Sequence, residues 1–220
     1  MIPGFAPSDV RADLHSGAAP AQSVTASTDW RGGLPILRAG AATLRQLQLS
    51  DAASLVDMLT TEDVTRFISP PPMTVAGFER FIAWTAHEQA AGRYLCFAIV
   101  PDGCRDAVGI IQIRALEPGF ATAEWGFALG STFWGTGLFH ESALVAIDFA
   151  FSRVGVHRLE ARAAIANGRG NAALRKLGAL PEAVLRRSFL CNGTYLDQIL
   201  WALAATEWTD FRSTALSPVH

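Results

Sequence analysis

The segment Trp134-Gly135-Thr136-Gly137 stands between an apolar, strand-like stretch, Phe120 to Leu129, and a long apolar stretch with helical periodicity that begins after Gly137. Glycine at these two positions lets an anion approach the main chain, because no Cβ obstructs it. The start of a helix also offers backbone N–H groups that have no intrahelical partner, and its dipole favours negative charge. This order of elements predicts a phosphate cradle, although a ligand-free turn between strand and helix would have the same pattern.

The glycine turn matches neither of the common nucleotide motifs. Walker A requires Lys followed by Ser or Thr after the last glycine, whereas Leu138 follows Gly137. A dinucleotide site requires a β-α-β unit, but the preceding apolar segments are separated only by turn signals, Pro101-Asp102-Gly103 and Glu117-Pro118-Gly119. Such short connections predict an antiparallel meander. We therefore expect neither ATP nor NAD as the ligand.

The rest of the chain alternates between strand-like and helix-like patterns. Runs of strands with few helices and one helical crossover predict an α+β fold in a single domain. The expected elements, in order, are a strand at Thr43 to Leu47, a helix capped by Ser50-Asp51, an amphipathic helix around Phe78 to Trp84, strands at Tyr94 to Val100, Ala107 to Ile113 and Phe120 to Leu129, a helix ending near Gly155, a strand at His157 to Ile165, a helix ending at Leu177-Gly178, and a closing hairpin of Val184 to Leu190 with Tyr195 to Leu203.

Length and composition limit the class of protein. The 220 residues suit one domain, which we place at 34–209, after a Pro-, Gly- and Ser-containing extension at 1–33 that we expect to be flexible and before a tail at 210–220. Half of the residues are hydrophobic and the formal net charge is −2, with arginines scattered along the chain. No basic stripe is present to neutralise a run of phosphates, so nucleic acid is not the expected partner.

The three cysteines and five histidines show no metal-ligand spacing. We therefore expect no zinc site, no disulfide framework and no metal cofactor, and we interpret His87, His140 and His157 as packing or surface residues. No apolar run is long enough to span a bilayer, and no basic start followed by an apolar stretch indicates a secretory signal. The expectation is a cytoplasmic protein without a membrane partner, and a homodimer is left open.

Several motifs resemble the GNAT superfamily of N-acetyltransferases, over about Leu34 to Trp208. Its acetyl-CoA-binding core is similar to Glu124 to Leu129, the glycine turn and Glu141. Its ribosomal-protein-alanine-acetylating, RimJ/RimL-like branch is similar to three further segments. These are His157-Arg158-Leu159-Glu160-Ala161, Asn167 with Leu177-Gly178, and Tyr195-Leu196-Asp197 before Trp208.

The resemblance implies a mixed, mostly antiparallel seven-stranded sheet flanked by helices. It also implies that the fourth and fifth strands, Phe120 to Leu129 and His157 to Ile165, splay apart around the pantetheine arm of acetyl-CoA, with the pyrophosphate on the glycine turn. The cofactor-binding residues that it implies are Leu129, Gly130, Ser131, Trp134, Gly135, Thr136, Gly137, Leu138, Asn167 and Asn171.

The sequence departs from the family pattern at three positions. Thr132 replaces the usual Gln or Arg before the first glycine, and Gly170 replaces the Ser that usually follows Asn167. Leu174 stands where many members have a tyrosine that protonates the departing thiolate. These departures affect side-chain contacts and the general acid, but not the backbone cradle.

Glu124 is the candidate catalytic residue. An amine must lose a proton before it attacks a thioester, since an unperturbed ammonium is almost wholly protonated at pH 7. Alternation along the strand places Glu124 opposite Trp125, Phe127 and Leu129, toward a cleft rather than the main core. An ion-paired strand glutamate is the alternative interpretation, and Asp197 is open to substrate contact or to a role in the hairpin.

The expected reaction is acetyl transfer from acetyl-CoA to a primary amine, either a protein N-terminus or a small molecule. We expect direct attack without an acyl-enzyme, because no Cys or Ser lies in a nucleophile-base motif. The main alternative is a catalytically silent acyl-CoA-binding module, for which Gly170 and Leu174 are the supporting features. A cofactor-free interaction protein is the third alternative.

Overall fold

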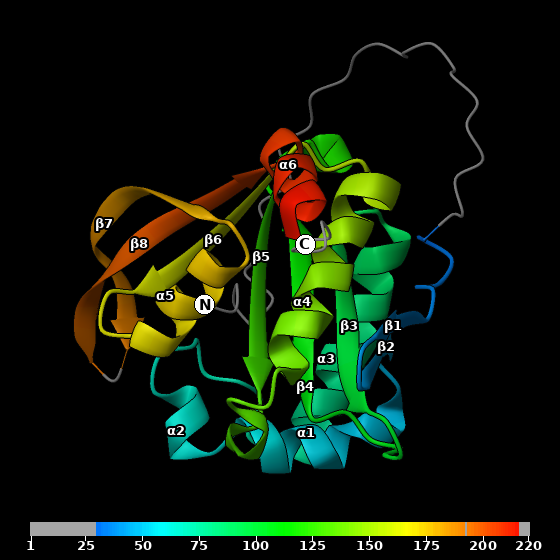
Figure 1. Cartoon of the computed structure of the whole chain (residues 1–220). Helices are drawn as coiled ribbons and strands as arrows, with labels where there is room; N and C mark the ends of the chain where they lie inside the picture. The colour runs from blue at the N-terminus through cyan, green and yellow to red at the C-terminus, as the bar shows by residue number, and fades with distance from the viewer. Residues whose placement is uncertain (1–29, 192, 216–220) are drawn as a thin grey trace, which may run out of the picture.

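A computed structural model describes residues 30–191 and 193–215. Its central feature is one sheet of eight strands in the order β1-β2-β3-β4-β5-β6-β8-β7 (Figure 1). The expected number of seven was therefore wrong. The additional strand is β1, Leu37–Ala39, which pairs with β2 at the rim of the sheet. Three residues are too few to produce a recognisable alternation, so the sequence did not reveal it.

The helices and strands follow the expected order along the chain, with α2 and α6 as the helices that the sequence did not indicate. The strands are β1 (Leu37–Ala39), β2 (Ala42–Gln46), β3 (Tyr94–Pro101), β4 (Gly109–Ala115), β5 (Thr122–Leu129), β6 (Arg158–Ala164), β7 (Leu180–Cys191) and β8 (Thr194–Ala204). The helices are α1 (Ala52–Leu59), α2 (Glu62–Thr65), α3 (Val75–Ala90), α4 (Leu138–Phe149), α5 (Gly168–Lys176) and α6 (Ala205–Ala215).

The predicted meander is confirmed, because β3, β4 and β5 pair in sequence order and antiparallel. The next strand across the sheet, β6, runs parallel to β5 after the α4 crossover. These two strands share only three paired positions, the last of which is Glu124 with Glu160. Beyond that rung the strands diverge, as Figure 1 shows, and a gap opens in the sheet between them. The predicted splay is therefore present.

Helices cover both faces of the sheet. In Figure 1, α4 lies in front of the sheet and α3 lies behind it. One hydrophobic cluster contains Trp125, Ile147 and Trp201 and joins the sheet to α4 and α5. A second cluster contains Leu55, Phe78 and Phe81 and joins the other face to α1 and α3. Trp125 and Trp201 are thus core residues, each 1% exposed.

The domain boundaries remain predictions, since most of the two end segments lies outside the described residues. Trp30, within the expected extension at 1–33, is 6% exposed and packs in the first cluster. The expected tail at 210–220 starts inside α6, which continues to Ala215. The hairpin between β7 and β8 is present as predicted, although Asn192 in its turn is outside the described residues.

Candidate active site

The glycine turn leads directly from the open end of β5 into α4. A short 3₁₀ turn, Ser131–Phe133, follows the strand, and Gly137 is the N-cap of the helix. Gly135 and Gly137 have φ values of 79° and 88°, and a Cβ on either would meet nothing within 4 Å. Backbone conformation rather than space therefore requires glycine here, because L-residues rarely adopt this left-handed region.

The beginning of α4 leaves backbone donors available. The first intrahelical bond runs from the Glu141 N–H to the Gly137 carbonyl, at 3.1 Å. The Thr136 hydroxyl donates to the Phe133 carbonyl and also accepts weakly from the Leu138 N–H, at 3.4 Å. The amides of Phe139 and His140 lie within the first turn, where a helix provides no carbonyl partner. An anion at this turn would meet these donors and the positive end of the helix dipole.

The turn forms one wall of a cavity of about 560 Å³. The cavity joins four parts of the chain that are distant in sequence: α2 with the loop after it, the end of β5, the glycine turn with the start of α4, and α5. Its described lining residues are Asp63, Val64, Arg66, Phe67, Ile68, Phe127, Ala128, Leu129, Phe133, Trp134, Gly135, Gly137, Phe139, His140, Asn167, Gly168, Arg169, Gly170, Ala173 and Lys176.

Two side chains fix the mouth of this cavity beside β5. The Trp134 indole N–H donates to the Leu129 carbonyl, at 2.9 Å, and so ties the glycine turn to the strand end. The Arg169 guanidinium lies 4.2 Å from the centre of the Trp134 ring, in a cation–π contact that joins α5 to the turn. These two contacts keep the start of α4 and the start of α5 close together, so that both line the same cavity.

Asn167 caps α5 through its side chain, whose Oδ1 accepts from the Gly170 N–H at 2.9 Å. A Cβ built on Gly170 would lie 2.6 Å from Nδ2 of the same asparagine. Glycine at this position therefore allows the asparagine side chain to fold back over the helix start. A serine would force Asn167 to move, which gives a physical reason for this departure from the family pattern.

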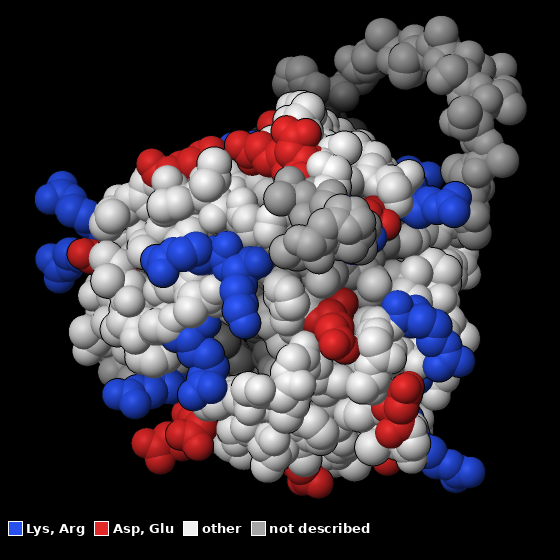
Figure 2. Space-filling view, in the orientation of Figure 1, with Lys and Arg blue, Asp and Glu red and all other residues white. Residues whose placement is uncertain are grey.

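The cavity is lined by more positive than negative side chains. Arg66, Arg169 and Lys176 are cationic, and Asp63 is the single carboxylate among the described lining residues. Figure 2 shows basic side chains gathered over α5, beside a hollow in the surface. Burial lowers the pKa of His140, and the positive charge of Lys176 lowers it further. An anionic ligand would be favoured in such surroundings.

The family model described as an acetyltransferase (GNAT) domain matches residues 42–180 of this sequence, which include β2 to β6, the glycine turn and α5. The chain belongs to the GNAT acetyltransferase family. It is accordingly an N-acetyltransferase that uses acetyl-CoA, and the cavity beside the glycine turn has the donors and charge that suit the phosphates of that cofactor.

Individual GNAT proteins are similar over most of the chain. The uncharacterized N-acetyltransferase p20 of Bacillus licheniformis is 25% identical over 167 residues, which cover 76% of this chain and 94% of p20. The [ribosomal protein uS5]-alanine N-acetyltransferase of Escherichia coli is 26% identical over 127 residues, covering 57% of this chain and 64% of the relative.

The similarity extends to solved GNAT structures. RimJ of Mycobacterium smegmatis, solved in complex with CoA-disulfide, superposes with a TM-score of 0.73 at 23% identity, covering 85% of this chain and 96% of RimJ. The ribosomal-protein-S5-alanine acetyltransferase of Vibrio fischeri superposes with a TM-score of 0.72 at 18% identity, covering 79% of this chain and 98% of that one. At these identities the superpositions establish the shared fold.

The structure brings half of the cofactor residues expected in this GNAT chain to the cavity. The residues that line it are Leu129, Trp134, Gly135, Gly137 and Asn167, whereas Gly130, Ser131, Thr136, Leu138 and Asn171 are not among its lining. Gly130, Ser131, Thr136 and Leu138 lie between the end of β5 and the first residue of α4. Their roles in cofactor binding stay predictions.

Asn171 and Gly130 have clear roles within the fold. The Asn171 amide donates to the carbonyls of Ala164 and Asn167 and accepts from the Trp201 indole, at 2.9 Å. Its side chain thus joins α5 to β6 and β8 and is 7% exposed. A Cβ on Gly130 would lie 2.8 Å from the Met58 sulfur. Close packing of α1 against the strand end therefore accounts for the glycine.

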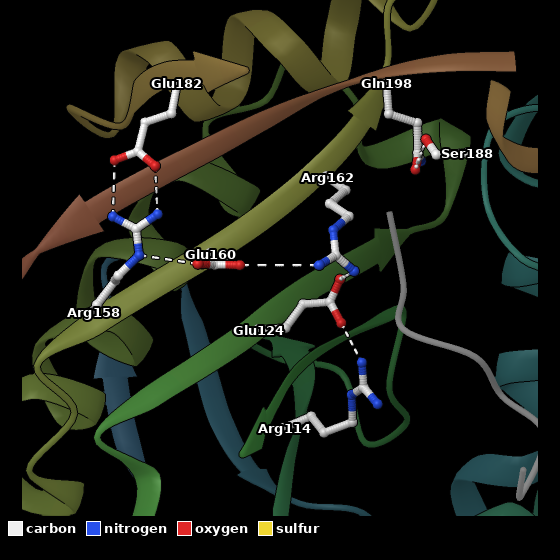
Figure 3. A network of polar contacts seen from close by, with 8 residues as sticks. All are labelled: Arg114, Glu124, Arg158, Glu160, Arg162, Glu182, Ser188 and Gln198. Atoms are coloured by element: carbon white, nitrogen blue, oxygen red, sulfur yellow. Dashed lines mark hydrogen bonds and ion pairs between the residues drawn. The ribbon is translucent and has the colours of Figure 1, made fainter. Parts of the chain in front are cut away.

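Glu124 is 3% exposed and is held by two arginines (Figure 3). Arg114 on β4 donates to one carboxylate oxygen at 2.5 Å, and Arg162 on β6 donates to the other at 3.1 Å. The chain of contacts continues from Arg162 through Glu160 to Arg158. Glu124 is therefore an ion-paired strand glutamate, which was the alternative interpretation of the sequence. It is not among the residues that line the cavity.

Sequence reasoning missed the charged residues of α5. Arg169 and Lys176 line the cavity together with His140, which the sequence had suggested was a packing or surface residue. Their spacing on one helix face was the available signal, but exposed basic residues on a helix are common and carry no chemistry by themselves. Leu174, at the position of the family's tyrosine, is completely buried in the core.

Two absences can be stated for the described part of the chain. No helix there is long and apolar enough to cross a membrane. Within the same residues, no group of three or more His, Cys, Asp or Glu side chains is arranged to hold a metal ion.

Proposed function

We propose that this GNAT protein transfers the acetyl group of acetyl-CoA to a primary amine by direct attack on the thioester. The observation that carries the proposal is the position of the cavity. It contains the glycine turn and the end of β5, the strand that separates from β6 beyond Glu124. Backbone N–H groups on the β6 side of β5 beyond that rung would be free to polarise the thioester carbonyl.

Direct attack is supported by what lines the cavity. Among the described lining residues there is no cysteine or serine that could carry the acetyl group. Cys96 is buried in the second hydrophobic cluster, and burial raises the pKa of its thiol, which opposes formation of a thiolate. An amine held beside the thioester needs no enzyme-bound intermediate, since proximity alone supplies much of the rate.

For removal of the amine's proton, we propose that Glu124 acts through a water that it orients. Each of its oxygens accepts one bond from arginine and keeps a further lone pair, but Glu124 is not among the cavity lining, so a water would have to link the carboxylate to the amine. The departing thiolate has less need of a general acid, because a thiol with an ordinary pKa of about 8.5 leaves as an anion more readily than an amine does. Leu174 at the tyrosine position is consistent with departure of the unprotonated thiolate.

The acceptor class that we favour is the α-amine of a protein N-terminus. The support is the similarity to the Escherichia coli relative, whose name gives an alanine of ribosomal protein uS5 as its acceptor. A small-molecule amine is the competing acceptor class, and we include both in one assay. Release of CoA would be measured from acetyl-CoA with peptides that begin with alanine and with a panel of small amines.

The Glu124→Gln variant tests the proton route, with Glu79→Gln as a control because Glu79 is exposed on α3 and lies outside the chain of ion pairs that contains Glu124. We expect Glu124→Gln to reduce kcat about 100-fold or more while the Kd for acetyl-CoA changes little. The control should keep wild-type turnover. Unchanged turnover in Glu124→Gln would contradict the assignment, and covalently acetylated protein after incubation with acetyl-CoA alone would contradict direct attack.

A catalytically silent acyl-CoA-binding module remains the second candidate function. It is favoured by the two arginines on Glu124 and by the buried Leu174. Binding of acetyl-CoA without release of CoA for any peptide or amine would support this module and contradict the transferase reaction.

A further inference from the structure

Lys176 is the last residue of α5, and it lines the cavity. Gly170 and Ala173, which precede it at intervals of three residues, line the cavity as well, so one face of the helix is turned toward it. Lys176 forms no ion pair with a carboxylate of the described residues. Its ammonium is therefore a cation on the cavity wall whose charge is available to a ligand.

The helix α5 runs back along the gap in the sheet, from the open end toward the last β5–β6 rung. It begins beside the end of β6, because the Asn167 N–H donates to the Ala164 carbonyl at 2.9 Å. Its last turn lies beside the start of β7, because the Ala179 N–H donates to the Leu174 carbonyl at 3.2 Å. The two ends of α5 therefore lie at different levels of the gap.

The strand registers give the level at which α5 ends. Leu180, the first residue of β7, pairs with Ala202 on β8, and Ala202 also pairs with Glu160 on β6. Glu160 in turn pairs with Glu124 in the last rung that β5 and β6 share. Lys176 therefore lies near the closed end of the gap.

The closed end of the gap is where the thioester would lie. In the proposed complex the pyrophosphate of acetyl-CoA occupies the glycine turn, and the pantetheine arm extends from there between β5 and β6. The acetyl group is at the far end of that arm, so it points toward the last rung. Arg169, near the other end of α5, lies over Trp134 and so remains beside the pyrophosphate.

Glu124 and Lys176 approach the gap from opposite faces of the sheet. Trp125 packs in the first hydrophobic cluster together with Leu174 of α5. Side chains alternate along a strand, so Glu124 points to the other face, where Ala128 packs in the second cluster. The protein thus has a proton acceptor on one face of the gap and a cation on the other.

The other ionisable side chains of the described cavity lining are less suitable neighbours for the sulfur. Asp63 is negative, and both it and Arg66 belong to α2 or its C-cap, which packs in the second cluster on the face opposite α5. Arg169 lies at the glycine turn. Burial lowers the pKa of His140, and the charge of Lys176 lowers it further, which favours the neutral imidazole.

We propose that the Lys176 ammonium stabilises the negative charge that develops on the CoA sulfur as the thioester breaks. This inference deepens the proposed function and rests on it, because it takes the cavity to be the acetyl-CoA site. The amine nitrogen forms a bond to the carbonyl carbon, and its proton passes to the water that Glu124 orients. The C–S bond then breaks with its electron pair on sulfur, and the thiolate leaves paired with Lys176, which keeps its own protons.

The same contact should act on the thiol of the product CoA. A cation close to a thiol favours the thiolate, because the neutral thiol gains little from the charge. Lys176 is exposed, so water and salt screen the attraction. We therefore expect the thiol of bound CoA to have a pKa about one pH unit below that of free CoA at low salt.

Ultraviolet titration of the thiolate in the complex of CoA with the full chain tests the assignment. The same protein saturated with desulfo-CoA, which lacks the thiol, is the blank for the protein's own cysteines and tyrosines. The variants are Lys176→Ala, Lys176→Arg and Arg169→Ala. Arg175→Ala is the matched control, because Arg175 belongs to the same helix, lies over Trp201 at 5.8 Å and is not among the cavity lining.

Lys176→Ala should return the pKa of the bound thiol to the value of free CoA, and Lys176→Arg should keep it low, since arginine retains the charge. Arg169→Ala should weaken CoA binding and leave the pKa of the bound thiol at the wild-type value. The control should change neither quantity. With an acceptor identified by CoA release, Lys176→Ala should also reduce kcat by up to about tenfold, the equivalent of one pH unit.

Three results would contradict the proposals, and they are distinguishable. A thiol pKa in the wild-type complex equal to that of free CoA, or equal values for wild-type protein and Lys176→Ala, would overturn the role of Lys176 while leaving the cofactor site intact. An unchanged kcat in Lys176→Ala would overturn its part in catalysis. Absence of CoA binding by the wild-type protein would overturn the cofactor site itself.

Discussion

Arg162 on β6 donates to Glu124 on β5, with 3.1 Å between Nη1 and Oε1, at the point where the two strands cease to pair. Glu124 pairs with Glu160 in the last shared rung, and Arg162 is two residues farther along β6. The ion pair therefore bridges the strands just beyond their last rung, where the gap in the sheet begins.

Replacement of Arg162 by methionine should lower the free energy of unfolding by about 1–2 kcal/mol, because Glu124 would keep one of its two cationic partners. Urea denaturation measures the change. Arg186→Met provides the control, since Arg186 is exposed on β7 and should change stability by less than about 0.5 kcal/mol. Equal effects of the two substitutions would show that the bridge does not stabilise the splayed strands.

The glycine turn gives a prediction about backbone conformation. Gly137→Ala should reduce the free energy of unfolding by about 1 kcal/mol and weaken acetyl-CoA binding, because alanine is strained at φ 88°. Gly168→Ala is the matched change at the start of α5, where φ is ordinary and a Cβ has open space. It should be neutral or slightly stabilising. Thermal denaturation distinguishes the two, and a neutral Gly137→Ala would contradict the requirement for glycine.

Asp51 should be a stability determinant far from the cavity. Its fully buried carboxylate accepts two bonds from Arg45, at 2.8 Å each, and one each from the Gln48 and Ala107 amides. Asp51→Ala would leave these donors without their acceptor, and we expect a loss of about 3–5 kcal/mol. Exposed Asp57 on α1 is the control, and its alanine variant should unfold at nearly the wild-type urea concentration.

His140 should make stability depend on pH near neutrality. Burial and Lys176 lower its pKa in the folded protein, and Glu141 opposes them. The unfolded chain therefore takes up a proton first as the pH falls. The contribution of neutral His140 to the free energy of unfolding is fully present above the ordinary histidine pKa of about 6.5. It is lost as the pH falls through the lowered pKa of the folded protein. Between pH 8 and pH 5 the melting temperature should fall less for His140→Ala than for the wild-type protein. An equal fall in the two proteins would contradict this assignment.

The cysteines should differ in reactivity. Burial raises the pKa of the Cys96 thiol, whereas Cys104 is exposed. A thiol reagent at pH 8 should label Cys104 rapidly and Cys96 only after urea is added, because the thiolate is the reactive form. Cys191 should react at an intermediate rate, since it is half-buried and donates to the Arg66 carbonyl. Mass spectrometry of the labelled peptides reads out each site, and rapid labelling of Cys96 in the folded protein would contradict its burial.

Sequence patterns were sufficient to predict those features of the fold that depend on residues close together in the chain. The β3–β5 meander follows from apolar alternation between Pro- and Gly-containing turns, and the glycine turn follows from two residues before a helix. The partners of Glu124 could not be predicted in this way, because Arg114 and Arg162 are 10 and 38 residues away and meet it only through strand register. The α5 cations were missed for a similar reason, since only the folded chain places Lys176 beside His140.

The early end of β5–β6 pairing gives the sheet two further edges inside the molecule. An edge strand presents unpaired N–H and C=O groups, and these normally attract another extended chain. Pantetheine is itself an extended chain with two amides, so in the proposed complex it would serve as a short guest strand between β5 and β6. The cofactor would then complete the hydrogen bonding of the sheet as well as deliver the acetyl group, and its departure would reopen both edges after every turnover.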